Sequence, residues 1–300
     1  MTAAAAPARR DTLVGMAFMT AGGFLLTTQD AIGKWLTSDY HAGEIMAYRG
    51  IFMLLPVMAA MWWQQDASFL RPRRPLAVGM RTLFTVLTSA FVVLSFMIMP
   101  LADALAVIFL SPLLVTALSV PLLGEAVGWR RWAAVLAGFA GVLMITSPEG
   151  IAFSWLILIP LTAALGGAMR DVITRRIGTT DSTLCVLFWA VFMTALAGFA
   201  TLPFGTHWPS LFDWSLFAAA GVLGGASHFL TTRAFQIAPA AVMAPFKYLS
   251  LVWGAGFGYL LWGDVPTPMK LAGAGLMVAS GLYVMQRERK LARQGRAGRP

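Results

Sequence analysis

The sequence is poor in the residues on which soluble enzymes depend. Its 300 residues include one cysteine, Cys185, and three histidines, and only 12% of the residues are charged. A single cysteine cannot form an internal disulfide and supplies no paired-thiolate motif for metal or redox chemistry. Soluble globular domains contain about 25% charged residues, so the composition excludes an ordinary soluble domain.

Catalytic and nucleotide-binding motifs are also missing from the sequence. It contains no HExxH, GxSxG or Walker A pattern, which excludes an ATP-driven pump built from this chain alone. The histidines His41, His207 and His228 lie in different segments and lack the spacing of metal ligands. We therefore expect no metal, no cofactor and no enzymatic activity.

Long apolar runs dominate the sequence, in which 58% of the residues are hydrophobic. A helix needs about 20 apolar residues to cross the hydrocarbon core of a bilayer. Windows of this length predict ten spans, at 13–36, 43–63, 76–99, 101–123, 129–147, 154–176, 182–203, 213–236, 239–263 and 267–286. The first run is too long for a cleaved signal peptide. The short connections leave no room for a separate soluble domain.

The cations are distributed unevenly around these spans. The chain ends and alternate connections carry sixteen lysines and arginines, whereas the other connections carry only Lys34 and Lys270, at helix ends. The positive-inside rule therefore predicts that both termini are cytoplasmic. We expect the basic tail, 287–300, to contact anionic lipid and not nucleic acid.

Two segments of the sequence repeat at a nearly constant offset. "PLADALAVIFLSPLLVTALSVPLLGE" begins at Pro100 and "PAAVMAPFKYLSLVWGAGFGYLLWGD" at Pro239, which is 139 residues later. "DAIGK" from Asp30 and "DVITR" from Asp171 are offset by 141. The offsets indicate a duplicated unit of five helices, and an odd number of spans forces the second copy into the membrane from the opposite side.

The predicted fold class is therefore an all-α integral membrane protein with ten transmembrane helices in a 5+5 inverted repeat. The first repeat is expected at 13–147 and the second at 154–286, with 1–12 and 287–300 in the cytoplasm. Transporters with this architecture alternate access around a site near the midplane.

These features resemble the EamA family of the drug/metabolite transporter superfamily. The shared features are the proline-led fourth and ninth helices ending in "LLGE" and "LWGD", and a "DAxxK" first helix followed by Arg49. One departure is that Arg49 aligns with Ala190 in the second half. Within the family, the chain is most similar to amino-acid exporters of the YddG type.

The resemblance implies a monomeric secondary transporter that exports neutral and aromatic amino acids across a bacterial inner membrane as its two repeats rock. Three alternatives remain open at this point: transport of another metabolite or drug in either direction, a membrane-embedded enzyme acting on lipid, and a scaffold that transports nothing.

Lys247 is the only charge in the apolar run 240–262. It lies roughly 10 Å into the hydrocarbon core, counted along the helix. A lysine at this depth either snorkels to the interface or faces a wet cavity. We expect the cavity, where the ammonium meets a substrate carboxylate or a coupling proton, with Tyr248 or His228 nearby.

Other candidates for the cavity wall come from the repeat. Thr85 and Ser89 are four residues apart and share a helix face, and His228 occupies the position 139 residues after Ser89. Hydroxyls in membrane helices serve either packing or cavity lining, and both alternatives stay open here. An imidazole near midspan needs a polar partner or water, so His228 is expected to line the pore.

Prolines and charges inside the spans suggest moving or gating elements. Pro112 and Pro245 cannot donate a backbone hydrogen bond, so each is expected to kink its helix, for packing or to open a cavity. Four charges near the outer ends of the first two helices are expected either to pair structurally or to form a gate. They are Asp30, Lys34, Glu44 and Arg49. By the inversion, Arg170 and Asp171 would form a second gate at the cytoplasmic end.

Overall fold

The computed structural model describes residues 9–64, 71–123, 128–146, 155–177, 181–237, 243 and 246–297, and all regular structure within them is helical. The first half contains α1 (Arg9–Leu36), α2 (Ala42–Gln64), α3 (Pro75–Ile98), α4 (Leu101–Ile108), α5 (Ser111–Leu123) and α6 (Trp129–Thr146). The second half contains η2 (Trp155–Ile157), α7 (Leu158–Ile177), α8 (Thr183–Thr201), η3 (Leu202–Phe204), α9 (Leu211–Ile237), α11 (Leu249–Trp262) and α12 (Pro268–Ala297).

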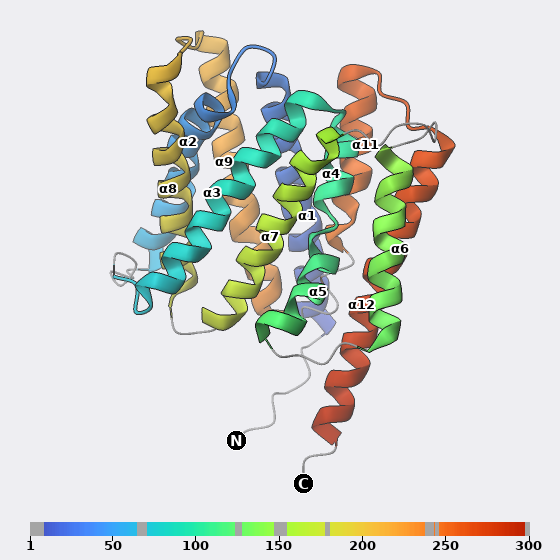
Figure 1. Cartoon of the computed structure of the whole chain (residues 1–300). Coiled ribbons are helices and arrows are strands. Elements are labelled where there is room, and N and C mark those ends of the chain that lie inside the picture. Colours follow the sequence, from blue (N-terminus) through green and yellow to red (C-terminus); the bar gives the residue numbers. More distant parts are fainter. Residues whose placement is uncertain are drawn as a thin grey trace.

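These helices confirm the predicted fold class, with α4 and α5 together forming one span. Within the described residues, five helical stretches are long and apolar enough to cross a membrane. They are Ala42–Trp63, Pro75–Ile98, Leu101–Leu122, Trp155–Thr174 and Thr183–Phe204. The helices run up and down the molecule in alternation, and α1 begins at the same end at which α12 finishes (Figure 1). We call this the termini end, and the other the opposite end.

The two halves are interleaved and do not form separate bodies. The most extensive packing joins α1 to α9, α2 to α8, α3 to α7 and α6 to α12, so every pair has one member from each half. An inverted repeat relates α1 to α7 and α3 to α9, and the α1–α9 and α3–α7 pairs are therefore symmetry equivalents. Each repeat therefore makes its most extensive contacts with the other repeat.

Glycines allow the helices of different halves to approach closely. A Cβ on Gly141 of α6 would lie 2.6 Å from the carbonyl oxygen of Gly273 in α12, and a Cβ on Gly273 would lie 2.6 Å from that of Gly141. Neither space can hold a methyl group, so the α6–α12 contact depends on both residues. Association through small residues is typical of membrane helices, where packing replaces the hydrophobic driving force.

The fourth span is interrupted where α4 gives way to α5. The Phe109 N–H still donates to the carbonyl of Leu105, but Leu110 donates to Val107, which tightens the turn before Ser111 begins α5. Pro112 follows directly and cannot donate to the carbonyl of Ile108. Pro245, the other expected kink, lies outside the described residues.

The last helix is longer than its apolar run. The sequence predicted a span ending at 286, but α12 continues to Ala297 and carries most of the basic tail. Arginine, lysine, glutamine and glutamate favour helices, so the helix continues beyond the last apolar residue.

Candidate functional site

One face of α3 points away from lipid. Its exposed apolar side chains recur every three or four residues, as in a stripe that faces the bilayer. They are Leu76, Met80, Leu83 and Leu87. At 3.6 residues per turn, Arg81, Thr85 and Ser89 lie on the opposite, inward face. Sequence reasoning singled out the two hydroxyl residues but missed Arg81. A lone charge in an apolar run was the signal that could have identified it.

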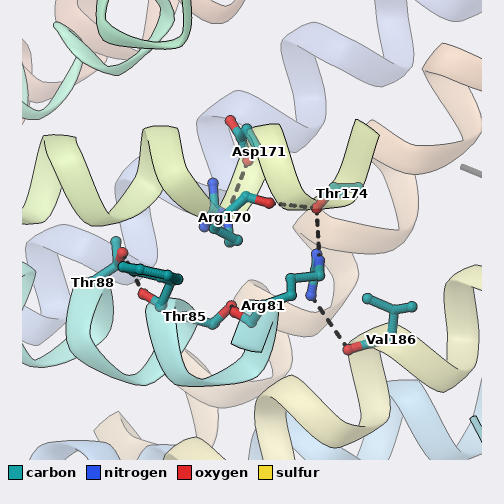
Figure 2. Close-up of polar contacts among 8 residues, drawn as sticks. Arg81, Thr85, Thr88, Arg170, Asp171, Thr174 and Val186 are labelled. Carbon is teal, nitrogen blue, oxygen red and sulfur yellow. Dashed lines mark hydrogen bonds and ion pairs between the residues drawn. The ribbon is translucent and has the colours of Figure 1, made fainter. Parts of the chain in front are cut away.

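Arg81 joins three helices through hydrogen bonds. Its Nε donates to the Thr174 hydroxyl of α7 at 2.8 Å, and a terminal nitrogen donates to the carbonyl oxygen of Val186 in α8 at 3.4 Å (Figure 2). Thr174 in turn donates to the carbonyl oxygen of Arg170 at 2.7 Å. The guanidinium is thus held between α3, α7 and α8.

Arg170 and Asp171 belong to α7 and lie near Arg81 of α3. The Arg170 Nε lies 3.0 Å from Asp171 Oδ1, and Figure 2 shows Arg170 projecting between α7 and α3. The two side chains are 30% and 45% exposed, although they lie away from the exposed side chains Leu158 and Leu165 of the same helix. Water therefore reaches the inward face of α7 at this depth.

Lys247 lies within electrostatic range of the same two residues, Arg170 and Asp171. It precedes α11, and the charges of Asp171 and Arg170 act on its ammonium group. Lys247 is exposed. His228 of α9 lies within electrostatic range of Arg170, Arg81 and Lys247.

We call these five residues the interior charge cluster. They are Arg81, Arg170, Asp171, His228 and Lys247. Together they comprise two arginines, one lysine, one histidine and one aspartate. Four of them were candidates from the sequence, and the structure brings these four together with Arg81 from four different helical segments.

Tyr248 differs from its expected position beside Lys247. Its hydroxyl occupies the space that a Cβ on Gly281 of α12 would need, and its ring lies 6.0 Å from that of Phe109. The residue is only 7% exposed. Tyr248 therefore packs the start of α11 against α12 and the end of α4. It is not part of the interior charge cluster, although Lys247 is.

The two hydroxyl candidates on α3 remain on the inward face. The Thr85 hydroxyl donates to the carbonyl oxygen of Arg81 within its own helix at 2.9 Å. Ser89 is partly buried one turn further along. Thr85 uses its hydrogen locally, but its oxygen lone pairs still face inward.

The outer charges do not form one ion-paired cluster among the described residues. Lys34 instead donates to the carbonyl oxygens of Phe96, at 3.1 Å, and Met99, at 2.8 Å. These carbonyls belong to the last turn of α3, where helical partners are absent and the helix dipole favours a cation. Lys34 also lies 5.4 Å from the ring centre of Trp262.

The other three outer charges have separate roles. Glu44 accepts backbone hydrogen bonds and is 1% exposed. Asp30 accepts from the Gln29 amide at 3.0 Å, and the charge of Arg49 acts on it without a contact short enough for an ion pair. Asp30 and Arg49 are both buried, so this pair is the part of the expected cluster that remains.

A different ion pair joins the helices at the opposite end. Lys270 Nζ of α12 lies 2.6 Å from Asp103 Oδ2 of α4. Sequence reasoning placed Lys270 at a helix end but did not identify its partner. Beneath it, Ala31, Phe96, Leu101 and Leu105 form a buried apolar cluster that packs α1, α3 and α4 together.

A groove of about 560 Å³ lies between α3 and α8. Its wall is mostly apolar and includes Val78, Leu83, Met193 and Leu196. Thr82 and Trp189 also line it, and within the described residues neither the Thr82 Oγ1 nor the Trp189 Nε1 has a hydrogen-bond partner, although both atoms are buried.

Comparison with protein families gives two matches on this chain. The EamA-like transporter family matches residues 13–147 and again residues 153–286. A protein of known crystal structure superimposes with a TM-score of 0.66 at 20% identity, covering 94% of this chain and 98% of its own. That similarity supports the fold alone.

Three relatives have names that state a cargo. The S-adenosylmethionine uptake transporter of Rickettsia prowazekii is 29% identical, over 87% of this chain and 88% of its own. The riboflavin transporter of Rhizobium johnstonii is 26% identical, over 94% of each chain. The pseudopaline exporter CntI of Pseudomonas aeruginosa is 25% identical, over 92% of this chain and 97% of its own. None of the three is an exporter of the YddG type, so they do not support the expected amino-acid specificity.

Proposed function

The chain belongs to the EamA-like transporter family, and from this premise we propose that it moves a small carboxylate-bearing metabolite through a path lined by the interior charge cluster. Its relatives carry small metabolites and are transporters, not enzymes. The finer proposal concerns which metabolite this chain carries and where it binds.

The observation that carries the proposal is the gathering of cations in the interior. Among the described residues, Arg81, Arg170 and Lys247 come from three segments and lie around the carboxylate of Asp171. Guanidinium groups bind carboxylates through two parallel hydrogen bonds, and an ammonium group binds them as a point charge. We expect these cations to receive a substrate carboxylate.

The relatives narrow the substrates worth testing first. S-adenosylmethionine and free amino acids carry a carboxylate, whereas riboflavin carries none. S-adenosylmethionine also carries a sulfonium and an ammonium group, so the cations favour its carboxylate and not the molecule as a whole. We therefore test both carboxylate-bearing solutes before riboflavin. The direction of transport depends on the gradients and follows from neither the fold nor the charges.

The access route is proposed from the contrast between the two ends. At the opposite end, the cluster around Phe96 and Leu101 and the Lys270–Asp103 ion pair join α1, α3, α4 and α12. On the termini side, Asp171 and Lys247 are exposed. We infer that this conformation is open toward the termini end, which the positive-inside rule assigns to the cytoplasm.

The interleaved packing suggests which parts move between conformations. Helices α1, α2, α8 and α9 pack extensively on one another, and so do α3, α5 and α7. We infer that these mixed groups tilt against each other, with the hydrogen bond from Arg81 to the Val186 carbonyl at their boundary. Each group contains helices from both repeats.

Flux into proteoliposomes tests the function directly. Purified protein is reconstituted without nucleotide, and uptake of labelled S-adenosylmethionine, of single amino acids and of riboflavin is measured against empty vesicles. Counterflow with internal unlabelled substrate removes the dependence on direction. Saturable flux of a carboxylate-bearing solute supports the proposal. Riboflavin flux without any carboxylate-bearing substrate would contradict the role given to the cations.

A further inference from the structure

Two of the three histidines in the chain meet at the opposite end. His41, Glu44 and His207 each offer a potential metal ligand, and these ligand atoms all lie within 4.8 Å of one another. His207 is separated from the other two by more than 160 positions and belongs to the other half of the chain. The fold alone brings them together.

Each ligand has a defined structural position. His41 ends the turn between α1 and α2, Glu44 lies in the first turn of α2, and His207 lies in the connection between η3 and α9. The imidazole rings are 6.1 Å apart between their centres and are exposed, whereas Glu44 is 1% exposed. The site is thus accessible from solvent and has a buried carboxylate at its base.

Backbone hydrogen bonds hold the Glu44 carboxylate between the two histidine segments. Its Oε2 accepts from the His41 N–H at 2.8 Å, and its Oε1 accepts from the His207 N–H at 2.6 Å. A carboxylate oxygen has two lone-pair directions, so each oxygen keeps one for a metal. The same bonds fix the backbone from which both imidazoles project.

Two imidazoles and one carboxylate form a ligand set that suits zinc. Zinc bound to nitrogen and carboxylate oxygen has bonds of about 2.0–2.2 Å, so its ligand atoms must come within about 3.4 Å of one another. The exposed histidine rings can close this difference by side-chain rotation. A water molecule would complete the tetrahedron, as in sites with three protein ligands.

We propose that His41, Glu44 and His207 bind a divalent transition-metal ion of the zinc class. The bound ion links the α1–α2 turn of the first half to the η3–α9 connection of the second. This site is separate from the interior charge cluster, which contains none of its residues. Imidazole ligands favour zinc, copper and nickel, whereas magnesium and calcium require oxygen ligands, so these two ions should not bind.

Calorimetric titration with zinc chloride tests the proposal on the full chain after complete removal of any affinity tag. We expect one zinc ion per chain, a rise in Tm with zinc, and no response to magnesium. His41→Asn and His207→Asn should each weaken zinc binding at least tenfold, and should fold normally because both rings are exposed. His228→Asn changes the only other histidine and is the matched control.

The absorption of bound cobalt gives an independent readout of the ligands. A four-coordinate nitrogen and oxygen site gives cobalt an intense visible spectrum, which His207→Asn should reduce and His228→Asn should not. Zinc binding of equal affinity in wild type and in the His41→Asn, His207→Asn double variant would overturn the proposal. Failure of the wild type to bind zinc would overturn it too, whatever the outcome of the flux experiments.

Discussion

Lys270 Nζ lies 2.6 Å from Asp103 Oδ2, and this ion pair joins α12 of the second half to α4 of the first. The side chains are 21% and 15% exposed, so water screens the pair only in part. Lys34 lies within electrostatic range of Asp103 as well. At the opposite end, an ion pair therefore joins the two halves through α4 and α12, which are not counterparts in the repeat.

Removing one partner of this pair should destabilise the protein more than removing both. Lys270→Met leaves the partly buried Asp103 without its ion-pair partner, at a cost of roughly 2 kcal/mol, between the values for exposed and for fully buried pairs. Asp103→Asn should have a similar effect, and the double variant should recover much of the loss. Thermal unfolding in detergent measures the coupling. Asp213→Asn with Lys270→Met serves as the control pair, because Asp213 bonds to Tyr40 and Ser210 elsewhere, and its effects should add. Additive effects in the Asp103 cycle would refute the coupling.

Gly281 should not tolerate a methyl group while Tyr248 keeps its hydroxyl. Gly281→Ala places a Cβ where the Tyr248 hydroxyl lies, and overpacking of this kind costs about 1–3 kcal/mol. Tyr248→Phe removes the nearest atom but keeps the ring carbon Cζ, 2.6 Å from that Cβ, so the double variant should recover part of the stability that Gly281→Ala loses. Gly275→Ala, on the same helix with open space around it, is the matched control and should leave Tm nearly unchanged. Equal losses in the single and double variants would show that Tyr248 points elsewhere.

Thr82→Val should stabilise the protein or leave it unchanged. The Thr82 hydroxyl is buried in the groove without a hydrogen-bond partner among the described residues, and an unsatisfied buried group costs about 1–3 kcal/mol. Valine keeps the shape and removes that cost. Thr194→Val is the control, since the Thr194 hydroxyl donates to the Ala190 carbonyl at 2.7 Å and its loss should bring no gain. A clear drop in Tm for Thr82→Val would mean that the hydroxyl has a partner in solution, such as lipid or water.

Lys247→Met and Arg170→Met should each reduce flux of a carboxylate-bearing substrate at least tenfold. Each removes one cation of the interior charge cluster, and a hydrogen bond to a charged group contributes roughly 1.5–3 kcal/mol, which corresponds to a factor of ten or more. Arg130→Met removes an exposed cation at the end of α6 and should keep wild-type flux. Initial rates in proteoliposomes decide between these outcomes, with Tm as the check on folding. Wild-type flux by Lys247→Met would mean that the lysine serves only to reach the interface.

The orientation of the chain can be measured with introduced cysteines. In a Cys185→Ser background, Trp208→Cys lies in an 85% exposed position at the opposite end, and Arg289→Cys lies near the end of α12. An impermeant thiol reagent on intact cells should label the first and not the second. The Cys185→Ser parent is the blank. Labelling of Arg289→Cys from outside would reverse the predicted cytoplasmic position of the termini.

The spans and the repeat could be predicted because both depend on residues that are close together in the sequence or that recur at a fixed offset. Apolar run lengths located the spans, and the offset between Pro100 and Pro239 identified the repeat. Lys247 could be singled out because one charge in a long apolar run is visible without a structure. The same reasoning applied to Arg81 would have completed the interior charge cluster.

Predictions failed where a side chain's neighbour lies on a distant helix. Tyr248 follows Lys247 by one residue, but one step turns about 100° around a helix, so the two side chains meet different partners. Lys34 was expected to join a group of paired charges or a gate, yet its ammonium donates to the carbonyl oxygens of Phe96 and Met99 at the end of α3. His41 and His207 looked unrelated in the sequence because only the packing of α2 on α8 and α9 brings their segments together.

The pairing of helices across the two halves has a consequence for how such a chain can be assembled. Helices that are not repeat counterparts pack in two equivalent pairs, α1 with α9 and α7 with α3. Helices that are repeat counterparts pack directly on each other, α2 with α8 and α6 with α12, and each of these pairs occurs once. A two-fold axis between two antiparallel five-helix subunits generates this pattern. Under such an axis, a helix of one subunit packs on the same helix of the other, or on a different helix in two equivalent copies. The main contacts of the molecule are thus those of an isologous dimer. Two polypeptides cut between α6 and η2 should therefore find each other in the membrane, provided that they insert in opposite orientations.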